Sequence, residues 1–205
     1  MAKVKIAVLA SGRGSNFKAI VESIERKECD ADCRVLICNN PDAGAVAIAK
    51  AHGVQVELID KKKFTKRSDL DDYIKLILDR YEVGLVVLAG YMLLIKSKKL
   101  LEAYRGRIIN IHPALLPAFP GDNAQEDAFK YGAKVSGLTI HLVDETLDGG
   151  EIVYQEAVDI SECKSADDVA AKILVREHKA YSKVIDSFAH GKYEIEGRRA
   201  RYVPL

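Results

Sequence analysis

Apolar segments alternate with amphipathic segments along the first half of the chain. The apolar segments show little polar alternation, which is typical of strands buried on both faces of a sheet. They occupy 3–10, 33–39, 54–59, 84–90 and 107–112. The segments between them repeat apolar residues at helical spacing, over 15–28, 43–53, 67–81 and 97–104. Strands that alternate with helices in this way are joined by right-handed crossovers and run parallel to one another. The pattern therefore predicts an α/β fold with a mostly parallel central sheet and helices on both faces.

The last third of the chain follows a different pattern. Two further strands, joined by the short segment DETLDGG, indicate an antiparallel pair at 134–143 and 151–160. One long helix is predicted over 165–191, with Ser165 as its N-terminal cap and a glycine at its end. Ser68 is expected to cap the third predicted helix in the same way. We therefore expect a single domain over 1–205, with an antiparallel C-terminal portion.

Charge and cysteine content narrow the class of protein. The chain has 31 Lys and Arg residues, 30 Asp and Glu residues and a net charge of +1, which does not predict a nucleic-acid surface or a polybasic membrane anchor. No apolar run reaches transmembrane length. Cys29, Cys33 and Cys38 are close in sequence, but their spacing differs from that of zinc sites, so no metal is expected. Reduced thiols without a visible export signal indicate the cytoplasm.

The turn after the first strand, SGRGSN at 11–16, is rich in glycine and leads into a helix. Free backbone N–H groups and the positive end of a helix dipole suit a phosphate group there, and Arg13 adds charge. A dinucleotide motif would place a third glycine where Phe17 stands, and an acidic residue where NNPD follows the second strand. The turn therefore favours a terminal monophosphate over NAD. The alternative is a tight turn that needs glycine only for its dihedral angles.

The segment NIHPALLPAFPG, at 110–121, places two chemically active side chains at the end of an apolar strand. Asn110 and His112 are two residues apart, so they point to the same face near the carboxyl end of the strand, where open α/β sheets bind ligands. Asp148, in the later LDGG turn, is a third candidate, because an aspartate near a histidine raises the histidine pKa. The alternatives are loop-capping hydrogen bonds and an ordinary Asp-Gly hairpin turn.

Five motifs resemble those of one family in both order and spacing: SGRGSN, VVLAGYM, NIHPALLPAFPG, LDGG and REHKAYSKVI. They are similar to the motifs of the phosphoribosylglycinamide formyltransferases, the folate-dependent enzymes of purine synthesis. NIHP and DGG are shared across the formyltransferase superfamily, whereas SGRGSN and the later EH narrow the match. The resemblance implies a single-domain, Rossmann-like formyltransferase fold. It also implies formyl transfer from 10-formyltetrahydrofolate to the amine of glycinamide ribonucleotide, without a metal.

The resemblance also implies roles for individual residues. The phosphate-binding or nucleotide-binding half is expected at 1–100, and the folate-binding and catalytic half at 101–205. The implied catalytic residues are Asn110, His112 and Asp148, and the implied substrate-binding residues are Gly14, Ser15, Asn16 and Glu177. The implied cosubstrate-binding residues are Arg67, Met92, Leu93, Leu94, Ile95, Asn110, His141 and Asp144. Because Leu93 stands where some members carry an arginine that meets the folate tail, Arg67 is expected to contribute more there.

Other activities share part of this pattern. Formyltetrahydrofolate hydrolysis uses water in place of the amine, and nucleotide-sugar formylation shares the core motifs. Transfer to initiator tRNA would require a basic surface, which a net charge of +1 does not predict. A non-enzymatic nucleotide-binding module would explain the glycine-rich loop and the sheet, but it would leave NIHP and LDGG as coincidental turns.

The expected partners are small-molecule substrates, with no nucleic acid and no membrane, and the chain is expected to be a monomer or a homodimer.

Overall fold

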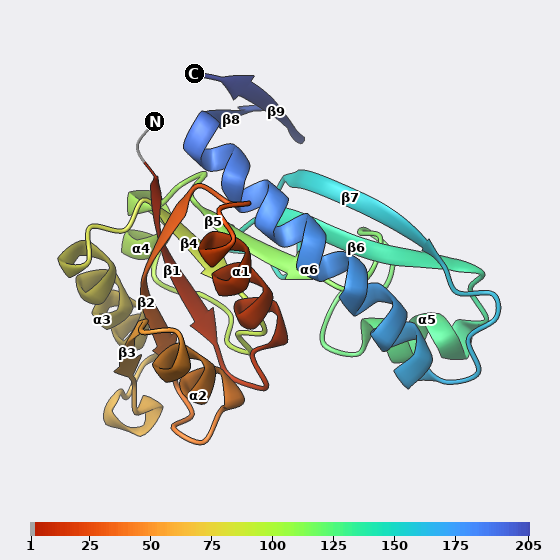
Figure 1. Cartoon of the computed structure of the whole chain (residues 1–205), viewed down its shortest axis with the longest axis horizontal. Coiled ribbons are helices and arrows are strands. Elements are labelled where there is room, and N and C mark those ends of the chain that lie inside the picture. Colours follow the sequence, from red (N-terminus) through yellow and green to blue (C-terminus); the bar gives the residue numbers. More distant parts are fainter. Residues whose placement is uncertain (1–2) are drawn as a thin grey trace.

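A nine-stranded sheet forms the centre of the computed structural model, which describes residues 3–205 (Figure 1). The strands are β1 (Val4–Ala10), β2 (Ala31–Cys38), β3 (Gln55–Leu58), β4 (Leu85–Leu88), β5 (Ile108–His112), β6 (Val135–Leu142), β7 (Ile152–Asp159), β8 (Gly191–Glu196) and β9 (Arg199–Pro204). The helices are α1 (Ser15–Glu25), α2 (Gly44–Ala51), the 3-10 helix η1 (Lys61–Lys63), α3 (Arg67–Arg80), α4 (Lys98–Ala103), α5 (Ala124–Tyr131) and α6 (Ala166–His190). Residues 1 and 2 of the predicted domain lie outside the described part.

The first five strands run parallel, as the apolar pattern predicts, in the order β3-β2-β1-β4-β5. They are apolar without alternation because helices cover both faces of the sheet. Ile6 and Val8 of β1 belong to one buried cluster with residues of α1, α2 and α6, whereas Ala7 and Leu9 belong to a second cluster with residues of α3 and α4. Figure 1 shows α1 and α6 side by side on one of these faces. No helix within residues 3–205 is long and apolar enough to cross a membrane.

The C-terminal part of the sheet is mainly antiparallel. β6 pairs antiparallel with both β5 and β7, which confirms the predicted antiparallel portion. The structure adds a hairpin of β8 and β9 that the sequence analysis did not predict, and β9 joins the sheet beside β7 through the single pair Ile152 and Arg199. The short helix α5 was also not predicted, because its eight residues follow a proline-rich segment and only two of them, Ala124 and Ala128, are buried.

The helix caps partly differ from the expectations. Ser165 accepts a hydrogen bond from the Asp168 backbone N–H at 3.1 Å, so it caps α6 as predicted. The prediction for Ser68 is wrong, because α3 already begins at Arg67, and no side chain caps it. Ser97 was not identified as a cap, yet its hydroxyl accepts a hydrogen bond from the Leu100 N–H at 3.2 Å and starts α4.

The strand order reverses between β1 and β4, and this reversal positions the functional site. The connections that leave these two strands turn in opposite directions, so a crevice opens between them at the carboxyl ends of the strands. The turn after β1 and the loop after β4 meet there, where the Ser11 N–H donates to the Gly90 carbonyl at 3.0 Å. β5, which carries Asn110 and His112, lies beside β4 and ends at the same edge.

Candidate active site

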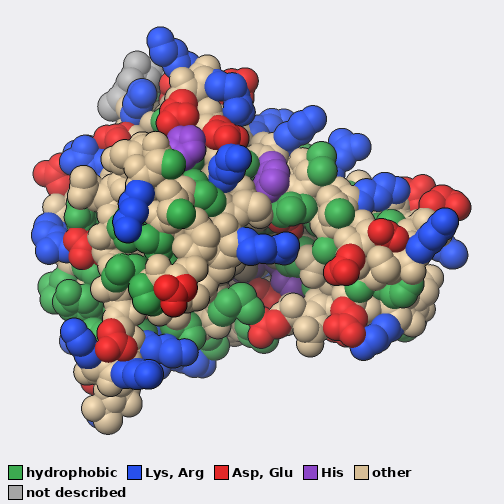
Figure 2. All heavy atoms as spheres, turned by 60° about the horizontal axis from the view of Figure 1, so that its bottom comes forward, with side chains coloured by type: hydrophobic (Ala, Val, Ile, Leu, Met, Phe, Trp, Pro, Cys, Tyr) green, Lys and Arg blue, Asp and Glu red, His purple; other side chains and the backbone are tan. Residues whose placement is uncertain are grey.

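A cavity of about 410 Å³ opens at this edge of the sheet. Figure 2 shows it as a hollow that contains histidine and acidic side chains, whereas acidic and basic side chains are interspersed over the rest of that face. The predicted site residues that line it are Asn16, Met92, Leu93, Leu94, Ile95, Asn110, His112, His141, Asp148 and Glu177. Four other predicted residues do not line it: Gly14, Ser15, Arg67 and Asp144.

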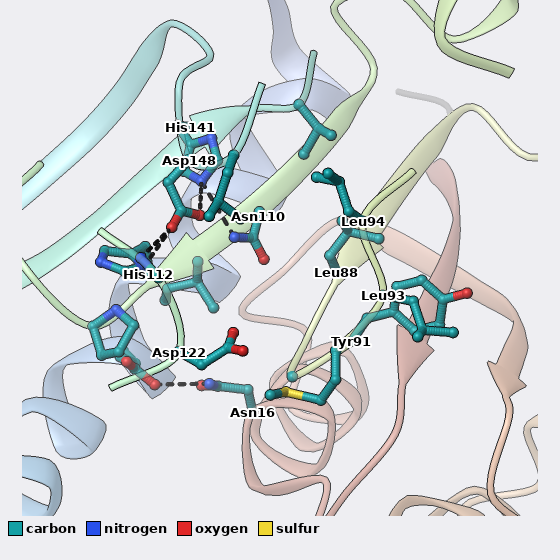
Figure 3. Close-up of a pocket in the computed structure, with 18 of the residues that line it drawn as sticks. Asn16, Leu88, Tyr91, Leu93, Leu94, Asn110, His112, Asp122, His141 and Asp148 are labelled. Carbon is teal, nitrogen blue, oxygen red and sulfur yellow. Dashed lines mark hydrogen bonds and ion pairs between the residues drawn. The ribbon is translucent and has the colours of Figure 1, made fainter. Parts of the chain in front are cut away.

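Asn110 and His112 project into the cavity from the end of β5 (Figure 3). The Asn110 side-chain amide donates to Nε2 of His141, which lies opposite on β6, at 3.2 Å. His112 is 3% exposed, and its Nε2 donates to the Phe119 carbonyl at 2.7 Å, because a carbonyl oxygen can only accept. The loop after β5 therefore folds back over the ring and occupies one of its two nitrogens.

Asp148 lies between the two histidines (Figure 3). Its Oδ2 accepts a hydrogen bond from the Gly121 N–H at 2.9 Å and lies 3.4 Å from Nδ1 of His112, while its Oδ1 lies 3.6 Å from Nε2 of His141. Its backbone is left-handed, with φ at 49°, a conformation that Asp tolerates better than most residues do. The turn between β6 and β7 thus directs one carboxylate at both imidazoles.

The pKa values of this cluster follow from burial and from the contacts just described. Contact with His141 is the main cause that lowers the Asp148 pKa, and the Gly121 N–H and His112 act in the same direction. Burial lowers the pKa of His112 below its usual value, although the Phe119 carbonyl and Asp148 act against it. Asp148 thus raises the His112 pKa, as expected, but burial acts in the opposite direction and is the larger of the two effects.

The turn after β1 borders the same cavity through Arg13 and Asn16. Gly14, directly before α1, has φ at 78°, and a Cβ there would lie 2.7 Å from the Ala45 Cα, so only glycine fits. The Asn16 amide donates to Glu177 Oε2 on α6 at 2.8 Å. Because Glu177 is buried, its pKa is raised, and the Asn16 hydrogen bond opposes that shift only in part.

A further wall of the cavity, next to the turn after β1, is formed by the loop after β4. Four consecutive residues from Met92 to Ile95 line the cavity, and Figure 3 shows Leu93 and Leu94 there with Tyr91 and Leu88. Neither Tyr91 nor Leu88 was predicted as a site residue, although the position of Leu88 at the carboxyl end of a buried strand was a usable signal.

Two predicted residues act from outside the cavity lining. Arg67 contacts the outer side of the loop after β4, through a hydrogen bond from Nε to the Leu94 carbonyl at 2.9 Å. The Asp144 carboxylate accepts a hydrogen bond from the Thr146 N–H at 2.8 Å and so fixes the turn that carries Asp148. Asp122, which the sequence analysis did not assign to the site, lines the cavity across from Asn110 (Figure 3).

The cysteines and the potential metal ligands lie apart from this cavity. All four cysteines are free, and burial raises the pKa values of Cys29 and Cys33 to about 12, so these thiols stay protonated at neutral pH. Within residues 3–205, the one group with metal-like geometry is Asp30, Asp186 and His190, and none of the three lines the cavity.

Comparison with known proteins places the chain among related enzymes. The formyl transferase family matches residues 4–185. Phosphoribosylglycinamide formyltransferase of Bacillus subtilis is 43% identical over 181 residues, which are 88% of this chain and 92% of the relative. Its Escherichia coli counterpart is 32% identical over 96% of this chain and 92% of the relative. The crystal structure of glycinamide ribonucleotide transformylase 1 from Symbiobacterium toebii superposes with a TM-score of 0.95 at 39% identity, over 98% of this chain and 95% of that one.

Proposed function

The chain belongs to the formyl transferase family, and on this premise we propose that it is a phosphoribosylglycinamide formyltransferase of purine biosynthesis. It transfers the formyl group of 10-formyltetrahydrofolate to the amine of glycinamide ribonucleotide and releases formylglycinamide ribonucleotide and tetrahydrofolate. The observation that carries the proposal is the convergence of Asn110, His112 and Asp148 on one cavity that also contains Arg13 and Asn16. Oxyanion donors and a phosphate-binding turn are the two parts that this reaction requires.

The proposed chemistry is attack of the amine on the formyl carbon. The formyl oxygen gains negative charge as the tetrahedral intermediate forms, and the amide of Asn110 and the ring N–H of His112 donate to it. One such donor is typically worth about 3–4 kcal/mol of transition-state stabilisation. Alignment of the amine and the formyl group in one cavity lowers the activation barrier further, by roughly 7–11 kcal/mol in well-oriented systems.

As the tetrahedral intermediate collapses, the bond between the formyl carbon and folate N10 breaks, and N10 takes up the proton that the attacking amine loses. His112 and Asp148 are proposed to move this proton. A neutral imidazole beside an anionic carboxylate suits a base, because a proton taken up by the ring is stabilised by the carboxylate 3.4 Å away. Negative charge on the nearby formyl oxygen favours the same imidazolium in the transition state. For His112 to donate from Nε2, the Phe119 carbonyl has to give up that nitrogen, so we expect the loop after β5 to shift when substrates bind.

The ligands are assigned to opposite sides of the cavity. The phosphate of glycinamide ribonucleotide is proposed to bind the backbone N–H groups of Gly14, Ser15 and Asn16, with Arg13 adding charge. Glu177 is proposed to contact the ribose hydroxyls or the glycinamide end. The pterin wall comprises Met92, Leu93, Leu94 and Ile95, together with His141, Asp144 and, indirectly, Arg67. The division into a half at 1–100 and a half at 101–205 remains part of this proposal, as do the lack of a metal, the monomeric or dimeric state and the cytoplasmic location.

A spectrophotometric assay tests the proposal and separates it from the alternatives. The protein is mixed with glycinamide ribonucleotide and 10-formyltetrahydrofolate or its dihydro analogue, and release of the deformylated folate is followed. We expect release only when glycinamide ribonucleotide is present. Release without it would identify a formyltetrahydrofolate hydrolase, and release only with a nucleotide sugar would identify the other formyltransferase. No turnover with any acceptor would favour a binding module.

A further inference from the structure

The loop from Tyr91 to Ser97 lines the cavity without regular secondary structure of its own. It connects β4 to α4, and four of its residues form the proposed wall for the formyl donor. A wall that binds a ligand through its backbone needs a fixed geometry, which an irregular segment does not have by itself. Contacts from outside the loop therefore have to set its shape.

Asp71, on α3, provides one set of these contacts. Its side chain is 0% exposed, and its Oδ2 accepts hydrogen bonds from the backbone N–H groups of Lys96 at 2.6 Å and Ser97 at 3.1 Å. Its other oxygen lies 2.9 Å from Nη2 of Arg67, one helical turn earlier. The carboxylate thus connects the C-terminal end of the loop to the helix behind it.

Arg67 provides the second set of contacts, at the middle and the start of the loop. Its Nε donates to the Leu94 carbonyl at 2.9 Å, and its Nη2 donates to the Tyr91 hydroxyl at 3.3 Å. The guanidinium carbon also lies 5.7 Å from the centre of the Tyr91 ring. One planar guanidinium thus contacts two points of the loop and Asp71 at the same time, a geometry that lysine cannot reproduce.

We propose that Arg67 and Asp71 are a positioning pair that holds the loop over 91–97 in the geometry that binds the formyl donor. The pair acts on the loop itself: its two side chains contact the loop from outside, and neither of them lines the cavity. A buried ion pair generally adds little net stability, because desolvation offsets the attraction, so stability is a weak explanation for this one. The contacts of Arg67 and Asp71 with four loop residues, which are Tyr91, Leu94, Lys96 and Ser97, indicate the positioning role instead. The identity of the ligand, but not the role of the pair, depends on the proposed function.

Steady-state kinetics on three variants test the pair. Asp71→Asn removes the charge but keeps the size, and Arg67→Lys keeps the charge but loses the planar fork. Asp79→Asn is the matched control, because Asp79 lies on the same helix, forms an ion pair with Lys75 at 2.6 Å, and has no contact with the loop. Each measurement gives kcat and the KM of each substrate separately, and thermal unfolding shows whether each variant is folded.

We expect the two loop variants to raise the KM of the formyl donor by about ten-fold, the typical effect of losing a hydrogen bond to a charged group. The KM of glycinamide ribonucleotide and kcat should change by less than about three-fold, because the other walls are untouched. Asp79→Asn should match the wild type. Arg67→Lys is the milder variant. If it is folded and its KM for the formyl donor equals that of the wild type, the proposal is overturned. Equal changes in the KM of the formyl donor and the KM of glycinamide ribonucleotide would also overturn it.

Hydrogen exchange separates a failure of this inference from a failure of the proposed function. The backbone amides of Lys96 and Ser97 donate to Asp71, so their exchange should be faster in Asp71→Asn and unchanged in Asp79→Asn, without any ligand present. If the wild type proves inactive with glycinamide ribonucleotide but exchange responds in this way, the proposed substrate is wrong and the positioning pair stands. Unchanged exchange at both amides would overturn the pair, whatever the activity of the wild type.

Discussion

Replacement of Asp148 by asparagine removes one charge from the proposed catalytic cluster and changes little else. Asparagine has nearly the same size and also tolerates the left-handed backbone, here with φ at 49°. Its amide oxygen can still accept the Gly121 N–H, which donates to Asp148 at 2.9 Å. The variant therefore isolates the effect of the negative charge on His112.

The size of that effect follows from the distance. Asp148 Oδ2 lies 3.4 Å from His112 Nδ1, so the attraction to an imidazolium is about 5 kcal/mol at an effective dielectric constant of about 20. One pKa unit corresponds to about 1.4 kcal/mol, which sets a ceiling of between three and four units. Relaxation and water entry reduce this value, so we expect the His112 pKa to fall by about one to two units in Asp148→Asn.

NMR titration of the His112 ring nitrogens measures the shift directly. Asp159→Asn is the control, because Asp159 also caps a turn through the Ser161 N–H, at 2.9 Å, and does not line the cavity. The formyl-transfer rate should fall by about 10²-fold to 10⁴-fold in Asp148→Asn, the usual contribution of acid–base catalysis. A His112 pKa within about 0.3 units of the wild-type value would refute the electrostatic reasoning.

Three further predictions concern catalysis, folding and pH. Asn110→Ala should lower kcat by about 10²-fold to 10³-fold without loss of fold, which steady-state kinetics would check; a change below three-fold would exclude an oxyanion donor. Gly14→Ala should lower the free energy of unfolding in urea by more than Gly53→Ala does. Both glycines have positive φ, so alanine at either position costs about 1–2 kcal/mol in backbone strain. Only at Gly14 would the new Cβ also clash, at 2.7 Å from the Ala45 Cα. Because burial lowers the pKa values of His112 and His178, the unfolded chain binds more protons below pH about 6.5, and stability should fall as pH drops through the folded pKa values. Urea unfolding of the wild type and of His178→Gln at several pH values tests this. The variant should lose less stability between pH 7.5 and pH 5, and an equal loss in both proteins would contradict the prediction.

Local sequence patterns were sufficient for most of the fold. The unbroken apolar segments and the helical spacing between them predicted the parallel strands and their crossover helices. Patterns failed where the element was short or polar, as in α5, or where a surface hairpin had little burial, as in β8 and β9. The wrong cap at Ser68 shows the same limit, because cap preferences are worth only about 1 kcal/mol and packing can shift a helix start by a residue.

By itself, the sequence determined that Asn110 and His112 share a face at the end of a strand, because side-chain direction in a strand has a fixed period of two residues. Only the tertiary structure decided which groups meet them there. The contact of Asp148 with His112, the bond of Asn16 to Glu177 and the burial that lowers the His112 pKa all depend on segments far apart in the chain. The physical reason is that periodicity records the surroundings of each element, whereas the distances between loops depend on how the whole sheet and its helices pack.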